Sequence, residues 1–563
     1  MDSYTVLFIA AALLIFVLIK GITDDKKREA KLEKKLRDNY GKAFKREYDA
    51  LEYDLISHYF KNKGTEESGV IDDITWNDLD MDNFYMSMNY TLSQTGEEYL
   101  FDMLHRPSTD KGVLEERGRV IRFFDENPEV RIKCQKAFAA MGRTKKYSLT
   151  DYMKRLNDIR EENNLLHLSC VLLGLVAISM IFIKAPVGFV LMLIATAFNV
   201  ATYFKRKGEI DPYIICFAYI VRTIRESKAL LEVDSSELSD YTDKLRKLLG
   251  NLGSLNKSVF WLVSGRNLTG SIMELPLDYI RIFFHLDLIR FNEMLRDIKH
   301  HRDDIYSLIE TVGFLDSAIA IGHFRHTIGY YTEPVFDEGE DTHLNIEGLF
   351  HPLLLKPVSC NISADRGVLV TGSNASGKST FLKSAALAVL MAETIFTVAA
   401  KKCDLSFFEI YSSMSIRDSL SAGDSYYMAE IRAMKRIMDA AKAKKDVALI
   451  CFVDEILRGT NTVERIAASS HLLKSLSSDK VLTFAATHDY ELTYMLESYM
   501  DNYHFSETIV DGNITFDYEL LEGRAESRDA IRLLDMIGYD AAITEAAFET
   551  SNKFIETGVW PKI

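Results

Sequence analysis

The chain has 563 residues, which is too long for one domain and enough for two or three hydrophobic cores. Its formal net charge of −15 argues against a surface built mainly to wrap nucleic acid, although a small basic groove is compatible with an acidic total. The six cysteines are scattered without C-x-x-C spacing, so they indicate neither a zinc site nor a disulfide framework. A reducing, cytosolic setting fits most of the chain.

The first apolar run extends from Tyr4 to Ile19 and is short for a membrane span, but Tyr4 and Lys20 can lie at the two interfaces. A cleaved signal peptide is the alternative; it would need a basic residue before the run and a small-residue cleavage site after it. Asp2 precedes the run and "KGITDDKK" follows it. The sequence therefore favours an uncleaved anchor over residues 1–20.

Residues 21–69 form a basic segment next to this anchor. Ten Lys or Arg residues lie between Lys26 and Arg46. They could attract anionic lipid headgroups, or they could belong to a solvated helix with interspersed Glu29, Glu33 and Asp38. The sequence leaves both interpretations open.

A second apolar block, at residues 165–204, is broken by Lys184, Ala185 and Pro186 into two runs that are each long enough to cross a membrane. Apolar character on all faces favours a transmembrane hairpin over the alternative, a hairpin buried in a soluble core. Basic residues follow the first and third runs, whereas the hairpin turn has only Lys184. The positive-inside rule then predicts a multi-pass protein of the cell membrane, with its amino terminus outside and both large segments in the cytosol.

The remaining segments differ in texture. Apolar periodicity predicts helices in residues 70–164 and again in residues 205–336, where one long amphipathic run extends from Leu277 to Phe324. Residues 337–521 alternate β-rich runs, "GVLVTG", "LSFFEIYSSM", "ALICFVDE" and "VLTFAATH", with helical stretches. That alternation predicts a parallel sheet covered by helices. Residues 522–563 are again helical in character.

The stretch "VLVTGSNASGKSTFL" has G-x-x-x-x-G-K-S spacing between a predicted strand and a predicted helix, which is the pattern of a phosphate-binding P-loop. Glycines let backbone N–H groups curl around phosphate oxygens, and the helix N-terminus adds a favourable dipole. We expect Lys378 to reach the β- and γ-phosphates of ATP and the Ser379 hydroxyl to coordinate Mg²⁺. The predicted nucleotide-binding residues of the loop are Gly372, Ser373, Asn374, Ala375, Ser376, Gly377, Lys378, Ser379 and Thr380.

Polar residues also end the next two core strands. "DVALICFVDE" ends in Asp454 and Glu455, and "VLTFAATH" ends in His488. The carboxyl ends of parallel strands share one edge, where α/β folds bind their ligands. Asp454 suits Mg²⁺, Glu455 suits a water-orienting or water-deprotonating role, and His488 is placed to sense or polarise the γ-phosphate. The alternative is that Asp454 and His488 only cap the ends of their strands. The recurrence of such polar residues at successive strand ends, after a phosphate loop, disfavours it.

Taken together, these stretches resemble the MutS family of ABC-type ATPases. The most specific match is "DEILRGTNT", beside "TGSNASGKST", "SLSAGDSYYMAEI" and "ATHDYEL"; "GLFHPLL" and "SQTGEEYLFDMLHRP" are further points of similarity. The resemblance implies an α/β P-loop ATPase domain joined to an all-α core and lever domain, with ATP and Mg²⁺ as cofactors. It implies that Glu455 and His488 act in catalysis, and that Gly423 and Ser425 contact the nucleotide of the opposite protomer of a homodimer. The tail after Glu522 is similar to the family's dimerising tail.

The chain also departs from the family pattern. Nothing before residue 70 resembles the mismatch-reading or connector domains, and Asp424 stands where a basic or neutral polar residue is usual. Three functions follow as alternatives. The first is a membrane-anchored ATPase whose dimer and levers move with ATP turnover, on DNA without mismatch reading. The second is a membrane scaffold or remodelling ATPase with a protein or lipid partner. An ABC exporter ranks last, because three spans give few helices for a pathway.

Overall fold

The computed structural model describes most of the chain. The described residues are 20, 23–24, 26–44, 46–64, 69–144, 146–159, 163–233, 235–253, 255, 274–337, 339, 341–373, 376–414, 426–443, 446–510, 513–525, 531, 534 and 537–563. The predicted first membrane segment lies outside them, and so do four predicted site residues, Asn374, Ala375, Gly423 and Ser425.

The chain divides into two compact units. Unit 1 comprises residues 1–65, 88–102 and 119–327, and unit 2 comprises residues 66–87, 103–118 and 328–563. Unit 2 therefore takes two short pieces from the first quarter of the chain in addition to the predicted α/β segment. Each unit has a core of its own.

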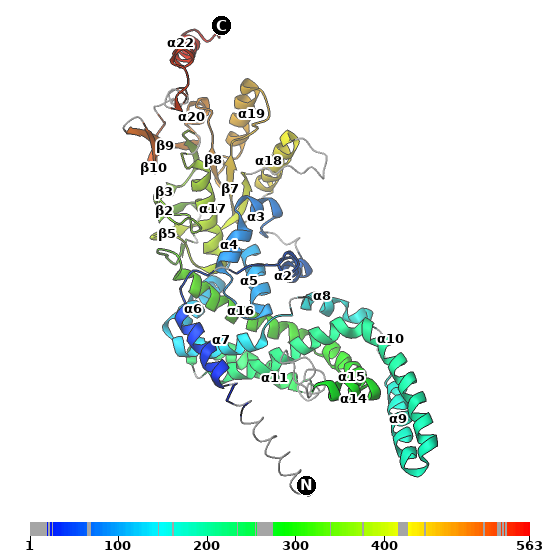
Figure 1. The fold of residues 1–563 in the computed structure, drawn as a ribbon. Coiled ribbons are helices and arrows are strands. Elements are labelled where there is room, and N and C mark those ends of the chain that lie inside the picture. The colour runs from blue at the N-terminus through cyan, green and yellow to red at the C-terminus, as the bar shows by residue number, and fades with distance from the viewer. Residues whose placement is uncertain are drawn as a thin grey trace. The chain divides into compact units, whose positions relative to one another are not determined.

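Unit 2 is an α/β unit built on two sheets, shown in Figure 1. The six-stranded sheet has the order β10-β9-β4-β8-β7-β6, with all neighbours parallel except β10 and β9. The four β-rich runs predicted from the sequence form β4, β8, β7 and β6, four of its five parallel strands, which confirms that prediction; the fifth is β9. A smaller sheet has the order β1-β5-β2-β3. The strands are β1 (Val335–Phe336), β2 (Leu344–Leu349), β3 (Cys360–Ala364), β4 (Gly367–Thr371), β5 (Lys402–Leu405), β6 (Phe408–Ser413), β7 (Ala448–Asp454), β8 (Val481–Ala486), β9 (Met500–Val510) and β10 (Asn513–Glu522).

The central strands of this sheet are apolar along their whole length because helices cover them. Every residue of β4, β7 and β8 is buried, and α17 packs on β7 and β8. Continuous burial is the pattern of a parallel sheet with both faces covered. The helices of unit 2 are α3 (Asp73–Asp78), α4 (Met81–Met88), α17 (Lys378–Ile395), α18 (Tyr426–Lys442), α19 (Thr462–Ser475), α20 (Glu491–Met495) and α22 (Ala541–Thr557).

Unit 1 is helical throughout its described residues. Two of its helices, α5 and α6, begin or end in unit 2. The elements are α2 (Ala50–Lys63), α5 (Gln94–His105), α6 (Lys111–Glu126), α7 (Pro128–Met141), α8 (Leu149–Lys154), η1 (Arg155–Asp158), α9 (Leu165–Ile183), α10 (Ala185–Glu226), η2 (Ser227–Glu232), η3 (Ser236–Leu238), α11 (Ser239–Asn251), α14 (Glu274–Phe284), α15 (Leu286–His300) and α16 (Arg302–Arg325).

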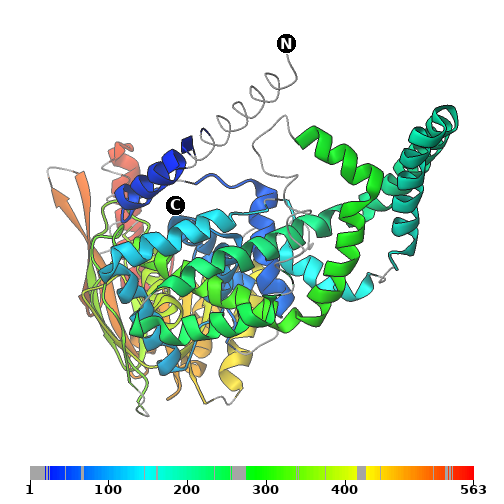
Figure 2. The ribbon, with the colours of Figure 1, turned by 90° about the horizontal axis from the view of Figure 1, so that it is seen from below.

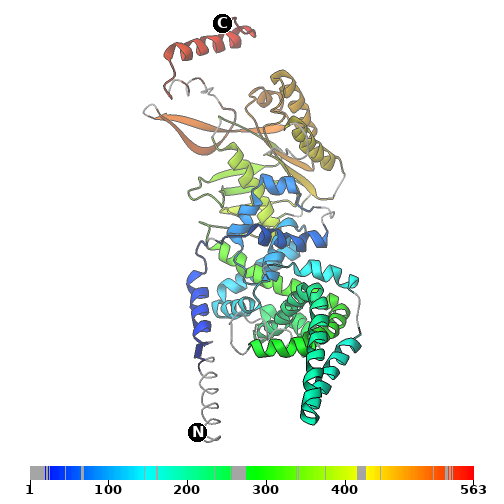
Figure 3. The same cartoon turned by 45° about the vertical axis from the view of Figure 1, so that its right-hand side comes forward.

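The second apolar block forms the predicted hairpin, with its turn at Lys184 between α9 and α10; Figure 3 shows the pair of helices projecting from unit 1. Both helices are long and apolar enough to cross a membrane, and only 22% of each apolar window is buried. The structure therefore contradicts the alternative of a hairpin buried in a soluble core. A third helix of this length and hydropathy, α16, is 83% buried and belongs to the core of unit 1.

Helix α10 does not stop at the predicted edge of the membrane segment. It is 42 residues long and continues beyond residue 204 to Glu226, with Pro212 inside it; Figure 2 shows it running into the other helices of unit 1. The hairpin is therefore joined to the helical unit by a continuous helix rather than by a loop.

The long run from Leu277 to Phe324 is not one helix. It forms α14, α15 and α16, separated at His285 and His301. His285 adopts φ 54°, a left-handed conformation that ends a helix, and its buried ring bonds the Asn199 carbonyl at 2.8 Å. A tertiary contact thus breaks a helix that the local sequence would continue.

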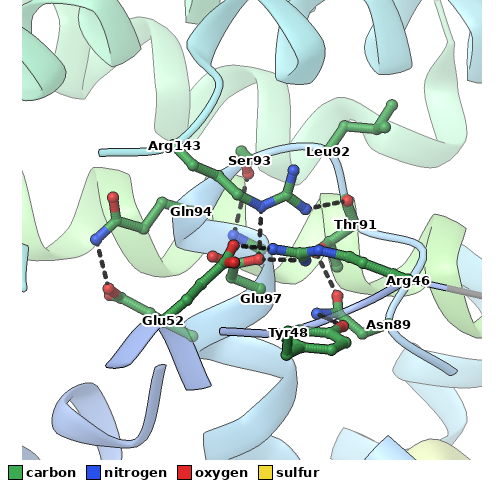
Figure 4. A network of polar contacts seen from close by, with 12 residues as sticks. Arg46, Tyr48, Glu52, Asn89, Thr91, Leu92, Ser93, Gln94, Glu97 and Arg143 are labelled. Carbon is green, nitrogen blue, oxygen red and sulfur yellow. Dashed lines mark hydrogen bonds and ion pairs between the residues drawn. The ribbon is translucent and has the colours of Figure 1, made fainter. Parts of the chain in front are cut away.

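A polar network fixes the chain between the basic segment and α5 within unit 1 (Figure 4). The buried Glu97 carboxylate accepts bonds from Arg46 at 2.8 Å and from Arg143 at 2.5 Å. Arg46 also pairs with Glu52 and lies 4.4 Å over the Tyr48 ring. Because a buried charge is costly unless it is paired, these contacts hold residues 46–52 against the start of α5.

Candidate functional site

The glycine-rich loop connects β4 to α17 at the carboxyl edge of the six-stranded sheet. Gly372 has φ 146°, and a Cβ there would lie 2.8 Å from the Ser376 hydroxyl oxygen. Gly377 has φ 109° and directly precedes α17. Both positions need the conformational freedom of glycine. The backbone can therefore turn tightly from the strand into the N-terminus of an 18-residue helix.

Lys378 points back toward this loop, and Ser379 points toward the end of β7. The Lys378 ammonium donates to the carbonyls of Gly372 at 2.9 Å and Ser373 at 2.8 Å. The Ser379 hydroxyl donates to Asp454 Oδ2 at 2.5 Å. Lys378 and Asp454 are buried side chains. The predicted lysine and the predicted magnesium ligands are therefore brought together.

The predicted catalytic residues meet at the same edge, at the ends of β7 and β8. His488 Nε2 and Glu455 Oε1 are 2.5 Å apart, and Arg458 Nε lies 2.6 Å from Glu455 Oε2. His488 Nδ1 is 3.5 Å from the Lys378 ammonium and 3.2 Å from the Gly372 carbonyl oxygen. The five side chains that the sequence singled out for phosphate, metal and water thus form one cluster.

The surroundings shift the pKa values of Asp454 and Glu455 in opposite directions. Burial raises the pKa of Asp454, opposed by the hydrogen bond from Ser379. The hydrogen bond from His488 lowers the pKa of Glu455, and the Arg458 and Lys378 charges act in the same direction. Glu455 is therefore held as a charged acceptor, whereas at Asp454 the effect of burial exceeds that of the Ser379 hydrogen bond and of the Arg458 and Lys378 charges.

The backbone of this segment is strained. Glu455 and Leu457 have φ 54° and 59°, in the left-handed region that side chains with a Cβ rarely adopt. Glu430 of α18 holds the segment by accepting a bond from the Arg458 N–H at 3.2 Å. Strain of this kind is found at functional sites, where neighbouring structure maintains it.

A pocket of about 460 Å³ opens beside the loop, within the usual size range of small-ligand sites. The loop residues Ser376 to Thr380 and Glu455 line one part of it. His351, Phe505 and Tyr518 are among the residues that line the rest. Burial lowers the pKa of His351 to about 4, so its imidazole is neutral at neutral pH.

The sequence interpretation did not assign a role to these three lining residues. His351 lies in "GLFHPLL", a stretch that resembles the family but carries no recognisable ligand-binding pattern of its own. Phe505 and Tyr518 lie on β9 and β10, more than 100 residues after the loop, and no local motif marks them. The pairing of β9 with β4 is what brings this ribbon to the pocket.

Comparison with known proteins identifies this α/β segment. Residues 368–555 match the family model MutS domain V. Over 267 residues, 44% of the chain is 30% identical to 27% of the mouse protein "MutS protein homolog 4". Over 222 residues, 38% of the chain is 30% identical to 26% of a "DNA mismatch repair protein MutS" of Thermus thermophilus.

A third relative is the "DNA mismatch repair protein MutS" of Thermotoga petrophila, which is 28% identical over 272 residues, 46% of this chain and 33% of that protein. The chain thus spans about a quarter to a third of the length of these curated relatives. The residues matched by the family model include all five side chains of the cluster.

Proposed function

The chain belongs to the MutS family through its domain V, and on this premise we propose that it is a membrane-anchored ATPase that hydrolyses ATP with Mg²⁺ at the edge formed by β4, β7 and β8. The observation that carries the proposal is the convergence of Lys378, Ser379, Asp454, Glu455 and His488 beside a pocket of about 460 Å³. Phosphoryl transfer needs positioning and charge stabilisation more than covalent chemistry, and these residues supply both.

The donor set fits a magnesium ion. Asp454 Oδ1 is buried and lacks a hydrogen-bond partner among the described residues, and the Ser379 hydroxyl lies 2.5 Å from Asp454 Oδ2. Mg²⁺ prefers such oxygen ligands, together with waters and phosphate oxygens. A bound cation would also offset the burial that raises the pKa of Asp454. Mg²⁺ would supply charge neutralisation at the phosphates.

Each remaining residue has a role that its contacts support. Lys378 carries the positive charge at the loop and would exchange its carbonyl partners for phosphate oxygens. Glu455, kept charged by His488 and Arg458, would accept a proton from the attacking water or orient it. His488 lies between Glu455 and the loop, where it would respond to the γ-phosphate.

The family resemblance further supports a homodimer with two composite sites. Gly423 and Ser425 are the residues we assign to the partner's nucleotide, and they lie outside the described residues. We expect a mixture of Lys378→Ala and Ser425→Arg proteins to be more active than either variant alone, because a heterodimer regains one intact site. A mixture no more active than its components would exclude sites shared between protomers.

The exposed hairpin supports the membrane part of the proposal. Only 22% of each apolar window is buried, and a contiguous apolar surface of this extent needs a nonaqueous environment. We assign the ATPase unit to the cytosolic side of the cell membrane.

Two partner classes remain as alternatives for the work that ATP turnover drives. The relatives' names, which refer to DNA mismatch repair, favour DNA, bound without mismatch reading. The net charge of −15 and the exposed apolar hairpin favour a scaffold or remodelling role on a protein or lipid partner. An exporter is disfavoured because the small number of apolar helices gives few elements for a transport pathway.

The central test compares two variants of the full-length protein in detergent. Lys378→Ala should weaken ATP binding, because it removes a charge-assisted phosphate contact. Glu455→Gln should keep binding and lose hydrolysis, because it retains the shape of the side chain and removes the proton acceptor. ATP binding and phosphate release are measured separately. Near wild-type hydrolysis by Glu455→Gln would show that the catalytic carboxylate is misassigned.

A further inference from the structure

The basic helix at residues 26–39 is held against unit 1 by one of its faces. Arg37 forms a bidentate pair with Glu129 of α7, with distances of 2.8 and 3.0 Å. Lys136, also on α7, pairs with Glu29 at 2.5 Å and with Glu33 at 3.3 Å. Leu36 lies on the same face and is only 3% exposed. The spacing of these residues, three or four apart, places them along one side of a helix.

The C-terminal end of this helix makes further contacts with unit 1. The Tyr40 hydroxyl bonds Asp125, and the Arg131 guanidinium lies 3.5 Å over the Tyr40 ring. The Gly41 N–H donates to His323 Nδ1 at 3.0 Å, and a Cβ at Gly41 would lie 2.7 Å from the His326 Cβ. Together with the Glu97 network of Figure 4, these contacts determine which face of the helix is turned away from unit 1.

The opposite face is basic. It carries five exposed cations with no ion pair among the described residues, namely Lys27, Arg28, Lys31, Lys34 and Lys35. Lys27, Lys31 and Lys34 follow one another at spacings of four and three residues, and Lys35 lies seven residues after Arg28. Asp38 is the exposed carboxylate of residues 26–39 on this face, so five cations and one carboxylate give these six residues a net charge of +4; a further exposed carboxylate, Asp24, precedes Lys27 by three residues. We refer to these six residues as the basic face; Figure 2 shows the helix at the edge of unit 1.

The sequence left two interpretations of this segment open, and the ion pairs of its glutamates favour the lipid-binding one. A solvated helix with interspersed charges would present Glu29 and Glu33 beside its lysines. Instead, both glutamates turn inward to Lys136, and the lysines turn outward. The two glutamates therefore lie on the face that contacts α7, and the opposite face keeps five cations against the single carboxylate of Asp38.

We propose that the basic face binds the headgroups of anionic phospholipids. Lys35, its last cation, is 16 residues beyond Ile19, the end of the apolar run, so the whole face lies within the flank of a membrane segment. Clusters of four to eight Lys or Arg residues in this position attract anionic lipid. The proposal rests on the proposed membrane anchoring and adds to it a requirement for lipid charge.

The test uses the full-length wild-type protein reconstituted into vesicles of phosphatidylcholine, with and without phosphatidylglycerol. Lysines are acetylated by an amine-reactive reagent, and the rate at each is read by mass spectrometry. We expect the rates at Lys27, Lys31, Lys34 and Lys35 to fall about fivefold in anionic vesicles only, the factor that corresponds to about 1 kcal/mol per cation. Lys402 and Lys435, exposed in unit 2, serve as internal controls.

Salt gives a second readout. Raising NaCl from about 0.1 M to about 1 M shortens the Debye length from about 10 Å to about 3 Å and should abolish the protection. The triple variant Lys31→Gln, Lys34→Gln, Lys35→Gln should lose the protection of Lys27 at lower salt than wild type. A matched variant, Lys228→Gln, Lys244→Gln, Lys247→Gln, removes the same charge from exposed positions of unit 1 and should behave as wild type.

The outcomes separate this inference from the proposed function. Protein that floats with both vesicle types, but whose basic-face lysines are acetylated at equal rates in both, would contradict the lipid contact. The proposed membrane anchor would be unaffected by that result. Protein that floats only with anionic vesicles, with the same lysines protected, would support the contact and contradict the apolar anchor. Protection of these lysines by duplex DNA and not by anionic vesicles would overturn the inference in favour of nucleic acid. ATP hydrolysis, tested through Glu455→Gln, is independent of all three.

Discussion

At the scale of single residues, Glu455 shows how the site prepares a proton acceptor. It follows β7 with φ 54°, so its carboxylate is turned toward the ends of β8 and the loop instead of continuing the strand. His488 and Arg458 each bind one of its oxygens, and these contacts lower its pKa. The strained backbone is thus linked to a charged acceptor that is aimed at the pocket.

The pKa of Glu455 makes a prediction about the acidic limb of the pH–rate profile. The carboxylate must be charged to act, and its lowered pKa keeps it charged to lower pH than an ordinary glutamate. His488→Ala removes the largest lowering contribution and leaves the burial, which raises the pKa. We therefore expect the acidic limb to move to higher pH, apart from any fall in the maximal rate. The measurement is hydrolysis at saturating ATP from about pH 4 to about pH 8.

A matched control is available for this variant. His504→Ala removes another imidazole of the same unit, which bonds the Gly523 carbonyl at 3.1 Å and has no contact with Glu455 among the described residues. Its acidic limb should coincide with that of wild type. An unmoved limb in His488→Ala, or one moved to lower pH, would mean that Glu455 is not the group that titrates.

At the scale of elements, a helix from the first part of the chain supports the edge strand β6. Asp78, at the end of α3, accepts bonds from the Ser412 hydroxyl at 2.7 Å and from the Met414 N–H at 2.8 Å. The Thr75 hydroxyl oxygen accepts the Ser412 N–H at 3.2 Å. Met414 is the last described residue before the segment that contains Gly423 and Ser425. The position of α3 therefore fixes the start of the segment that we assign to the partner's nucleotide.

We predict that Asp78→Ala destabilises unit 2 by about 2–4 kcal/mol, since each buried donor left without an acceptor costs about 1–3 kcal/mol. Denaturant unfolding in detergent, followed by tryptophan fluorescence, to which Trp76 in α3 contributes, measures the change. Asp73→Ala is the control, because Asp73 is exposed in the first turn of the same helix and should cost less than about 1 kcal/mol. Equal effects of the two substitutions would show that the buried bonds to β6 contribute nothing.

These elements also show how much of the fold could be predicted from the sequence. Four of the five parallel strands were predictable, because apolar runs such as those ending in Gly372, Asp454 and His488 are local patterns. The hairpin turn at Lys184 was predictable for the same reason. The break at His285 was not, since a buried contact with the Asn199 carbonyl stabilises a conformation that histidine rarely adopts. Nor could local pattern show that residues 66–87 join unit 2, because bonds to residues more than 300 positions away determine it.

At the scale of the whole molecule, the membrane orientation rests on the distribution of basic residues. Lysines and arginines follow the first and third apolar runs, and both large segments are then assigned to one side. Of the six cysteines, five are buried and Cys360 is half-buried, so added cysteines can be labelled against a low background.

We expect a cysteine at Lys184 to react with a membrane-impermeant maleimide in intact cells, and a cysteine at Lys205 to react only after the cells are opened. Lys205 is exposed just beyond the hairpin, whereas the neighbouring Lys207 pairs with Asp287 at 2.6 Å and is better left intact. Lys435→Cys, in α18, provides the same measurement for unit 2. Reaction of the Lys205 probe from outside would reverse the orientation.

The last prediction separates the two partner classes. Nothing before residue 70 resembles the mismatch-reading domain, so we predict that a mismatched duplex and a perfect one bind full-length protein in detergent with equal affinity. Binding that rests on phosphate contacts should weaken steeply as salt rises from about 50 to about 200 mM. The triple variant of the basic face should bind DNA as wild type does, since we assign that face to lipid. A clear mismatch preference would restore a lesion-reading role. Absence of binding at the lowest salt would exclude DNA and favour a protein or lipid partner, because phosphate contacts are strongest there.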